Sequence, residues 1–353
     1  MTPVVRAAGA RQLFTVGVAL AAGLVILTAG LGLAGYPPGR SLAALWQGGF
    51  GSWYALTSAT LLRSVPLITI GLGIALAFRA GALNIGADGQ FYAGAIAATA
   101  VGLQVGQWPP ILAIGVVWTA AAIAGALWVG VAVLLRLRFG VLEVISTLLL
   151  NFIALAFVSL MVTGPLQEAR HTYPQSDLIA EAARLPVLPG SRLHLGFLAS
   201  IALALGLWIL FSRTTWGFRL LATGASPRAA AIAGGIDTEA TIAAALLGSA
   251  AIAGFAGGLE VTGVSYALFQ NLSPGYGFTG IAVALLARLH PLGVVATGFL
   301  FAALEAGAGA MQRDAGVPSV AVYVVEAVVI VVVLLSDAYA RRARAAQVME
   351  DPA

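Results

Sequence analysis

The sequence predicts an all-α polytopic membrane protein with about ten transmembrane helices, an inverted repeat and broken helices. Three observations support this fold class. Of the 353 residues, 60% are hydrophobic and only 9% are charged, whereas a soluble domain carries about 25% charged residues. The mean hydropathy is +0.97. Apolar runs recur from residue 13 to residue 335 without a long polar block, so we expect a single transmembrane domain over residues 1–340 and a cytoplasmic tail over 341–353.

A transmembrane helix needs about 20 apolar residues, and fewer where neighbouring helices shield a broken one. The candidate segments are 13–35, 55–78, 88–105, 111–135, 141–164, 195–211, 240–264, 278–287, 292–311 and 320–335. The first is too long for the apolar region of a cleavable signal peptide, so we expect it to be retained. The eighth is too short to cross the membrane alone.

The arginines predict the orientation of these helices, because short cytoplasmic loops are enriched in basic residues. All 18 basic residues are arginine. Ten crossings with both termini in the cytoplasm place twelve of them inside and six outside. Residues 165–194 then form an extracytoplasmic loop, which we interpret as a solvated connector rather than a specific contact surface. Residues 212–239 form a cytoplasmic loop.

The composition also excludes several chemistries. The chain has no cysteine, which excludes disulfides, thiolate metal sites and cysteine nucleophiles. It has no lysine, which excludes a P-loop ATPase site and Schiff-base catalysis. The three histidines are isolated from one another, so no metal site is expected. A net charge of +4 is too small and dispersed to favour nucleic acid. We expect no enzymatic activity and no cofactor in this chain.

Two segments interrupt the hydrophobic pattern with glycines and amides, at residues 79–90 and 270–277. Backbone that leaves the helix at membrane depth must be buried in protein or line a wet cavity. Interrupted helices in corresponding halves of a chain indicate a transport path. The path residues that we predict from these segments and from the polar positions of segment 141–164 are Asn84, Asp88, Gln90, Glu143, Asn151, Gln270 and Asn271.

A weak internal match supports the pairing of the two interruptions. A shift of 187 residues aligns Phe91, Ala95 and Ala97 with Phe278, Ala282 and Ala284. Five crossings separate the two copies, which predicts an inverted repeat.

Ionisable side chains inside the predicted spans are a further group of candidates. They are Glu143, Glu260, Glu305 and Glu326, with Arg63 as a possible partner. Such residues line transport paths or form internal ion pairs, and for any single one we favour the internal pair.

The cytoplasmic loop contains a predicted helix of about two turns. Ser226 is a good N-cap, Pro227 suits the first helical position, and Gly234 can end the helix in the left-handed conformation. So short a helix is marginal alone in water. We expect a partner subunit to cover it, with packing onto its own membrane domain as the alternative. The contact residues that we predict are Ser226, Pro227, Arg228, Ala229, Ala230, Ile232 and Gly234.

Four segments resemble a known family in the same order along the chain. They are PLITIGLGIALAFRAG at 66–81 continuing into LNIGADGQ at 83–90, EVISTLLLN at 143–151, the loop 224–235, and GYGFTGIAVALL at 275–286. The chain resembles permease subunits of ATP-binding-cassette (ABC) importers for branched-chain amino acids, ribose and nucleosides. The resemblance spans about residues 55–335 and is nearest to the nucleoside or simple-sugar branch. One departure is Asp88, where that family more often has glutamate.

The resemblance implies a type II importer-like permease in a bacterial or archaeal plasma membrane. It implies a second permease, which we expect to form a heterodimer rather than a homodimer, two cytoplasmic ATPases that bind ATP and Mg, and an external substrate-binding protein or lipoprotein. The helix at 226–234 corresponds to the family's coupling helix. The expected solute is uncharged and polar, a nucleoside first and a simple sugar second.

Two alternatives stay open at this stage. The first is an ion-coupled secondary transporter that uses Glu260, Glu305 or Glu326 as its ion site. The second is a membrane scaffold or receptor that transports nothing and uses the helix at 226–234 as a signalling contact.

Overall fold

The computed structural model describes residues 17–18, 21–324, 326–328 and 331. Its elements are α2 (Pro38–Phe50), α3 (Trp53–Ala55), η1 (Leu56–Leu61), α4 (Leu62–Arg79), α5 (Ala87–Gly102), α6 (Pro110–Phe139), α7 (Glu143–Thr163), η2 (Glu181–Ala183), α8 (Gly196–Arg213), α9 (Thr215–Ala225), α10 (Pro227–Gly234), α11 (Thr238–Glu260), η3 (Val261–Ser265), α12 (Tyr276–Leu286), α13 (Pro291–Ala315) and η4 (Ser319–Ala321). Elements η1 and η3 are π-helices, whereas η2 and η4 are 3₁₀-helices. A further helix covers Ala21–Leu33.

Within the described residues, six helices are long and apolar enough to cross a membrane. They are Trp53–Arg79, Pro110–Phe139, Glu143–Thr163, Gly196–Arg213, Thr238–Ser265 and Pro291–Ala315. The prediction of an all-α polytopic membrane protein is therefore confirmed. The count of ten crossings stays a prediction, because part of the segment 320–335 lies outside the described residues, as do the start of segment 13–35 and the whole tail 341–353.

The chain folds as two compact units, residues 1–60 with 301–353 and residues 61–300. In the first unit, α2 packs on the second part of α13 through glycines. A Cβ atom on Gly48 would collide with Ala310, and one on Gly307 would collide with the carbonyl oxygen of Leu45. Small residues let apolar helices approach closely in this way. Helix α2 was not predicted, because its 13 residues include Arg40, Ser41 and Gln47 and fall short of a span.

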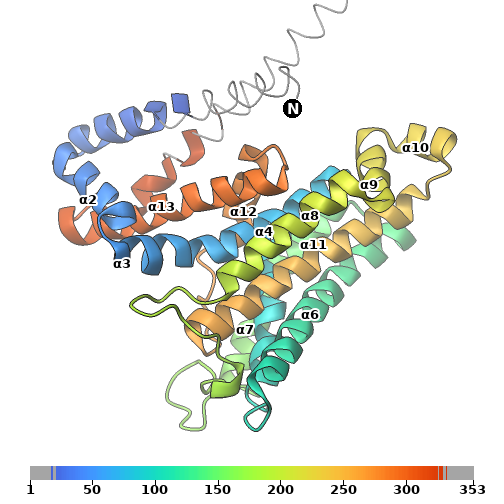
Figure 1. Ribbon diagram of the computed structural model, residues 1–353, viewed down its shortest axis with the longest axis horizontal. Coiled ribbons are helices and arrows are strands. Elements are labelled where there is room, and N and C mark those ends of the chain that lie inside the picture. Colours follow the sequence, from blue (N-terminus) through green and yellow to red (C-terminus); the bar gives the residue numbers. More distant parts are fainter. Residues whose placement is uncertain (1–16, 19–20, 325, 329–330, 332–353) are drawn as a thin grey trace, which may run out of the picture. The chain divides into compact units, whose positions relative to one another are not determined.

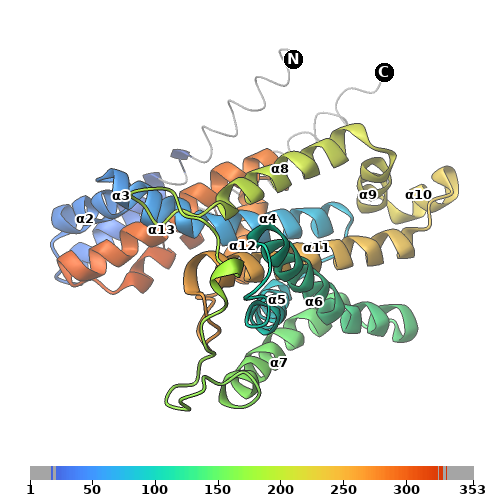
Figure 2. The same ribbon diagram turned by 60° about the horizontal axis from the view of Figure 1, so that its bottom comes forward.

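In the second unit, α11 is the central helix and packs against α4, α5 and α6 (Figures 1 and 2). Helices α5, α6 and α11 meet at Gly94, Gly125 and Gly254, where any added Cβ atom would collide with backbone. Helix α4 is also internal: 83% of the apolar stretch ending in α4 is buried, against 22% for α6. A helix that is apolar on all sides and fully enclosed is a core helix, whereas α6 presents a face to lipid.

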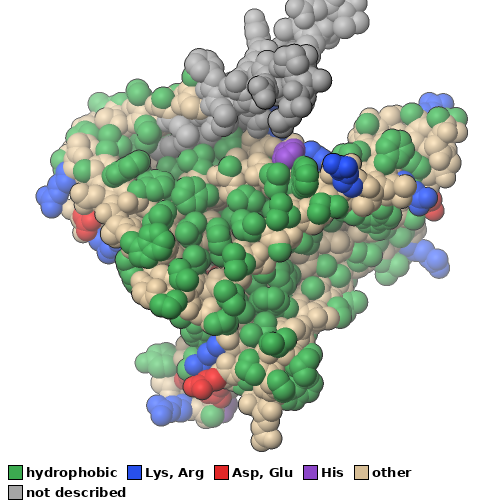
Figure 3. All heavy atoms as spheres, viewed as in Figure 1, with side chains coloured by type: hydrophobic (Ala, Val, Ile, Leu, Met, Phe, Trp, Pro, Cys, Tyr) green, Lys and Arg blue, Asp and Glu red, His purple; other side chains and the backbone are tan. Residues whose placement is uncertain are grey.

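The lipid-facing surface follows from the outer helices. Helices α6, α7 and α8 expose large apolar side chains such as Ile111, Leu127, Phe152 and Leu198. On the face shown in Figure 3, apolar side chains predominate and the charged ones gather at its margins. In water such a surface would drive aggregation, and a bilayer removes that cost.

The loop at residues 212–239, which we predict to be cytoplasmic, contains two helices rather than one. The predicted helix is confirmed as α10, and Ser226 caps it by accepting a hydrogen bond from the backbone N–H of Ala229 at 3.3 Å. The predicted end at Gly234 is wrong. Gly235 is the left-handed residue, with φ +58°, whereas Gly234 is still helical. Helix α9 was missed, although Thr214 caps it through the N–H of Gly217.

The loop at residues 165–194, which we predict to be extracytoplasmic, does more than connect α7 to α8. The N–H groups of Ser176, Ile179 and Leu185 donate to the carbonyls of Leu268, Tyr266 and Thr262 at 2.9, 2.8 and 2.8 Å. Ile179 and Ala183 are completely buried. The interpretation as a merely solvated connector is therefore wrong for this part of the loop, which covers the end of α11 and the chain after it.

The loop is also anchored by His194, which is 2% exposed. Its Nδ1 accepts a hydrogen bond from the N–H of Gly196 at 3.1 Å, and the ring lies so close to Gly263 that a Cβ atom there would sit 2.6 Å from it. Burial lowers the pKa of His194 from 6.5 to about 4. The folded protein therefore holds this ring in its neutral form.

The pKa of His194 predicts a pH-dependent stability. Between pH 6.5 and about 4 the unfolded chain binds a proton at His194 that the folded chain does not bind. The free energy of unfolding is therefore unaffected by His194 above pH 6.5 and decreases as the pH falls below that value. We expect the wild type to lose up to about 3 kcal/mol over this window and His194→Gln to lose much less. Thermal unfolding in detergent at a series of pH values measures this. His171→Gln, at an exposed site in the same loop, is the control and should follow the wild type; parallel curves for wild type and His194→Gln would contradict the assignment.

Candidate functional site

The first interruption lies between the end of α4 and the start of α5, where residues 80–86 leave the helix. Gly81 has φ +83°, a conformation that favours glycine. The polar backbone groups of this stretch need hydrogen-bond partners, because an unpaired amide at membrane depth costs several kcal/mol. Side chains from α5, α7 and α11 supply many of these partners.

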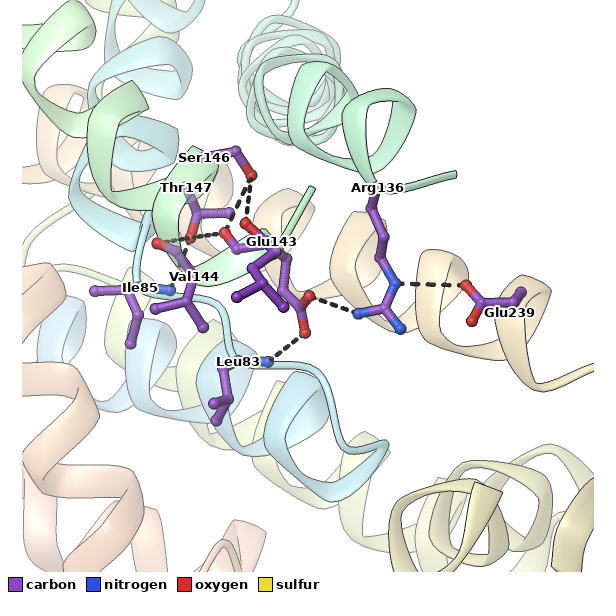
Figure 4. A network of polar contacts seen from close by, with 9 residues as sticks. Leu83, Ile85, Arg136, Glu143, Val144, Ser146, Thr147 and Glu239 are labelled. Carbon is purple, nitrogen blue, oxygen red and sulfur yellow. Dashed lines mark hydrogen bonds and ion pairs between the residues drawn. The ribbon is translucent and has the colours of Figure 1, made fainter. Parts of the chain in front are cut away.

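Helix α7 provides a row of three partners, Glu143, Thr147 and Asn151, which we call the α7 ladder. Successive members are four residues apart, so they lie on one face of the helix. The N–H of Leu83 approaches Glu143 Oε1 at 3.5 Å, and the N–H of Ile85 donates to Thr147 Oγ1 at 3.3 Å (Figure 4). Asn151 donates to the carbonyl of Ile85 at 2.9 Å.

Asn151 also reaches the first turn of α5, where its Oδ1 accepts a hydrogen bond from the N–H of Gly89 at 2.8 Å. A Cβ atom on Gly89 would lie 3.0 Å from that oxygen, so glycine permits the close approach. The α7 ladder therefore supports the interruption from Leu83 to the beginning of α5.

Asn84 and Gln90 form a closed amide pair beside the ladder. Asn84 Nδ2 donates to Gln90 Oε1 at 2.9 Å, and Gln90 Nε2 donates to Asn84 Oδ1 at 2.8 Å. Asn84 also donates to Ser249 Oγ of α11 at 2.9 Å and accepts from the N–H of Gly86 at 3.0 Å. Both amides are buried, with 0% and 1% exposure. Their polar atoms are therefore occupied by the protein itself.

The second interruption separates η3 from α12, and α5 supports it in the same manner. Asp88 and Tyr92 are one helical turn apart on α5. Asp88 Oδ1 accepts hydrogen bonds from Ser273 Oγ at 2.8 Å and from the N–H of Gly277 at 2.9 Å. Tyr92 donates to the carbonyl of Gln270 and accepts from the N–H of Ser273, each at 3.1 Å. Asp88 thus joins the start of α5 to the first turn of α12, where a carboxylate is also favoured by the helix dipole.

The seven predicted path residues therefore fall into two groups. Five support the interruptions from inside the protein: Asn84, Asp88, Gln90, Glu143 and Asn151. Gln270 and Asn271 are exposed, and Gln270 Nε2 donates to Ser159 Oγ of α7 at 2.8 Å.

Sequence reasoning missed four members of this arrangement: Thr147, Tyr92, Ser273 and Ser249. For Thr147 and Tyr92 a signal was available. Thr147 lies midway between the two polar residues already identified on α7, and Tyr92 lies one turn after Asp88. Ser273 lies within the second interruption, 270–277, which the sequence marks as a segment, whereas Ser249 lies in an apolar helix with no polar neighbour to single it out.

The predicted buried acids have different surroundings in the structure. Glu143 forms an ion pair with Arg136, with 2.6 Å between Oε2 and the guanidinium. Glu260 is buried at the end of α11, and Arg63 is close enough to stabilise its charge. Glu305 and Glu326 belong to the other compact unit. Internal pairing accounts for Glu143.

The coupling-helix candidate, α10, projects from the second unit with little cover from its own chain. Only Ala230 is buried, whereas Ile232 is 76% exposed. The remaining predicted contact residues are also exposed: Ser226, Pro227, Arg228, Ala229 and Gly234. Within the described residues its own chain covers α10 only at Ala230, and whether a partner subunit or its own membrane domain covers the rest stays a prediction. Ile232 is thus a large apolar side chain that α10 leaves exposed within its own chain.

Comparisons with known proteins cover most of the chain. Residues 56–334 match a family described as branched-chain amino acid transport system / permease component. The chain is 36% identical over 326 residues to the guanosine ABC transporter permease protein NupP of Bacillus subtilis, which covers 90% of this chain and 91% of that protein. It is 34% identical over 301 residues to the glucose ABC transporter permease protein TsgB13 of Haloferax volcanii, with 82% and 78% covered.

A second permease of Bacillus subtilis, the guanosine ABC transporter permease protein NupQ, is 26% identical over 253 residues, with 70% of this chain and 79% of that protein covered. No solved structure matches the chain.

The amide pair predicts a structural effect for Asn84. Removing its side chain in Asn84→Ala leaves Gln90, Ser249 and the N–H of Gly86 without a partner inside the protein, which we expect to destabilise the fold by about 2 kcal/mol. Unfolding in detergent measures this loss. Gln104→Ala removes an exposed amide after α5 and should leave stability unchanged. Normal stability of Asn84→Ala together with altered transport would instead make Asn84 a residue of the path.

Proposed function

Because the chain belongs to the branched-chain amino acid transport system permease family, we propose that it forms the transport path of an ABC importer for a nucleoside, with a simple sugar as the second candidate. The chain is a permease subunit of an ABC importer, and it is a multi-pass membrane protein. ATP hydrolysis takes place in partner subunits, which bind ATP and Mg. The ion-coupled alternative loses its support, because the relatives are ABC permeases.

The similarity to the guanosine permease carries the nucleoside proposal, since it extends over 90% of this chain. The similarity to the glucose permease supports a sugar as the alternative. Nucleosides and sugars are both uncharged and rich in hydroxyl groups, so amide and hydroxyl side chains suit their passage better than fixed charges do. The interrupted segments of this chain are rich in such groups.

We place the path beside the two interruptions. In this proposal the backbone of the path is held in shape by Asn84, Asp88, Gln90, Glu143 and Asn151. The exposed side chains of Gln270 and Asn271 meet the solute. Joined by Asp88, the starts of α5 and α12 form one movable constriction. A rigid-body movement of these helices would open the path to one side of the membrane and then to the other.

The proposed partners follow from the exposed α10 and from the relatives. An ABC ATPase docks on α10 and moves it during ATP binding and hydrolysis. A second permease completes the path, and a heterodimer is favoured because Bacillus subtilis has two matching guanosine permeases, NupP and NupQ. A substrate-binding protein or lipoprotein delivers the solute from outside a bacterial or archaeal cell.

Transport assays test this function directly. The complex purified through a tag on this chain is reconstituted in liposomes with its binding protein, and uptake of labelled guanosine and labelled glucose is measured. We expect guanosine uptake that requires ATP on the ATPase side and that excess glucose does not inhibit. Uptake driven by an ion gradient in the absence of the ATPase would refute the proposal.

A variant of α10 tests the docking surface. Ile232→Asp places a charge on an exposed apolar side chain, so it should weaken ATPase docking without unfolding the membrane helices. We expect ATP-dependent uptake to fall by about tenfold or more, which corresponds to roughly 1.4 kcal/mol at an interface anchor. Ile232→Leu keeps the apolar contact and should transport normally. Co-purification of the ATPase and uptake are measured for both; equal behaviour of the two variants would remove α10 from the interface.

A further inference from the structure

A chain of charged contacts leads from the cytoplasmic loop into the membrane domain (Figure 4). Glu239 lies in the first turn of α11, directly after the loop that carries α10. Arg136 at the end of α6 faces Glu239 through Nε at 3.4 Å and Glu143 through its terminal guanidinium nitrogen at 2.6 Å. One guanidinium therefore joins the loop's return into the membrane to the start of α7.

Glu143 continues the connection, because it is the first member of the α7 ladder. Its second oxygen, Oε1, approaches the N–H of Leu83 at 3.5 Å. Its helix then holds Ile85 through Thr147 and Asn151. A displacement of α7 at its first residue is thus transmitted to the backbone of the first interruption.

The other end of the same loop also touches this region. Helix α9 packs so tightly on the end of α4 that a Cβ atom on Gly224 would collide with the carbonyl oxygen of Arg79. A Cβ atom on Gly81 would lie 3.3 Å from the Cα of Gly224. The segment that carries α10 is therefore held against the interruption at both of its ends, by a glycine contact before α10 and by the charged contacts after it.

The charged contacts differ in strength along the chain. The side chains of Arg136 and Glu143 are only 21% and 10% exposed, and their contact is short. Glu239 is 60% exposed and its contact is long, so this pair is worth little to stability. The arrangement combines a firm inner pair with an outer contact that can be made and broken at small cost.

We propose that Arg136 is a positioning residue that couples movement of the α10 loop to the first interruption of the transport path. The inference rests on the proposed function, because it assumes that an ATPase moves α10. Arginine suits this role better than lysine, since its planar fork presents separate N–H donors to the two carboxylates at the same time. The role requires no contact between Arg136 and the solute.

The test compares ATP hydrolysis and guanosine uptake in the reconstituted complex for the wild type, Arg136→Gln and Arg136→Lys. We expect Arg136→Gln to assemble and hydrolyse ATP within about twofold of the wild type while uptake per ATP falls about tenfold, within the range by which single substitutions change coupling. Arg136→Lys should recover part of the uptake.

Controls separate coupling from folding. Arg138→Gln removes the same charge from an exposed site two residues away and should transport like the wild type. Glu239→Gln breaks only the exposed outer contact, so it should fold and still lower uptake per ATP about threefold, which keeps the test decisive if Arg136→Gln does not fold. Normal uptake per ATP in Arg136→Gln and Glu239→Gln, or loss of hydrolysis and uptake in proportion, would overturn the inference. If the wild type itself shows no ATP-dependent uptake, the proposed function fails and the inference with it.

Discussion

The structure of the 61–300 unit depends on one constraint, the need to pair backbone amides that leave the helix at membrane depth. Lipid offers no hydrogen bonds, so every such group must find its partner within the protein. Around the first interruption, helix α7 contributes a polar face, α5 contributes Gln90 and α11 contributes Ser249. Three helices are thereby fixed around one short stretch of extended chain.

The same constraint explains why the helices pack so closely. A side chain from α7 can reach the chain before α5 only if the helices nearly touch, and glycine allows this at Gly89, where the added atom would meet Asn151. The contacts among α5, α6 and α11 at Gly94, Gly125 and Gly254 bring further helices together. In a membrane, where apolar surfaces gain little from meeting each other, such close packing and polar contacts hold helices in place.

How well the sequence predicts each structural feature depends on how far apart along the chain the interacting residues lie. Transmembrane helices such as α6 and α8 depend on local hydropathy, and their predicted bounds agree with the structure within a few residues. Helix α10 was found because its N-cap is local too. The hydrogen bonds of the loop at 165–194 and those of Asp88 join residues far apart in the chain. Neither periodicity nor composition contains that information.

The polar residues that marked the interruptions in the sequence therefore have a different meaning in the fold. Asn84 and Gln90 were identified because amides are rare in apolar helices, but in the structure they satisfy each other and the local backbone. Asn84 uses both of its N–H donors and both lone pairs of its oxygen in these bonds, so it cannot also bind a solute without breaking one of them. In the proposed function, solute recognition by this subunit then relies on groups left exposed beside the interruptions, such as Asn271, and on the proposed second permease. If the backbone of the interruptions and the side chains hydrogen-bonded to it move as a unit, the movement exposes such groups to one side of the membrane or the other. The side chains that hold this backbone are then as important to transport as the groups that touch the solute.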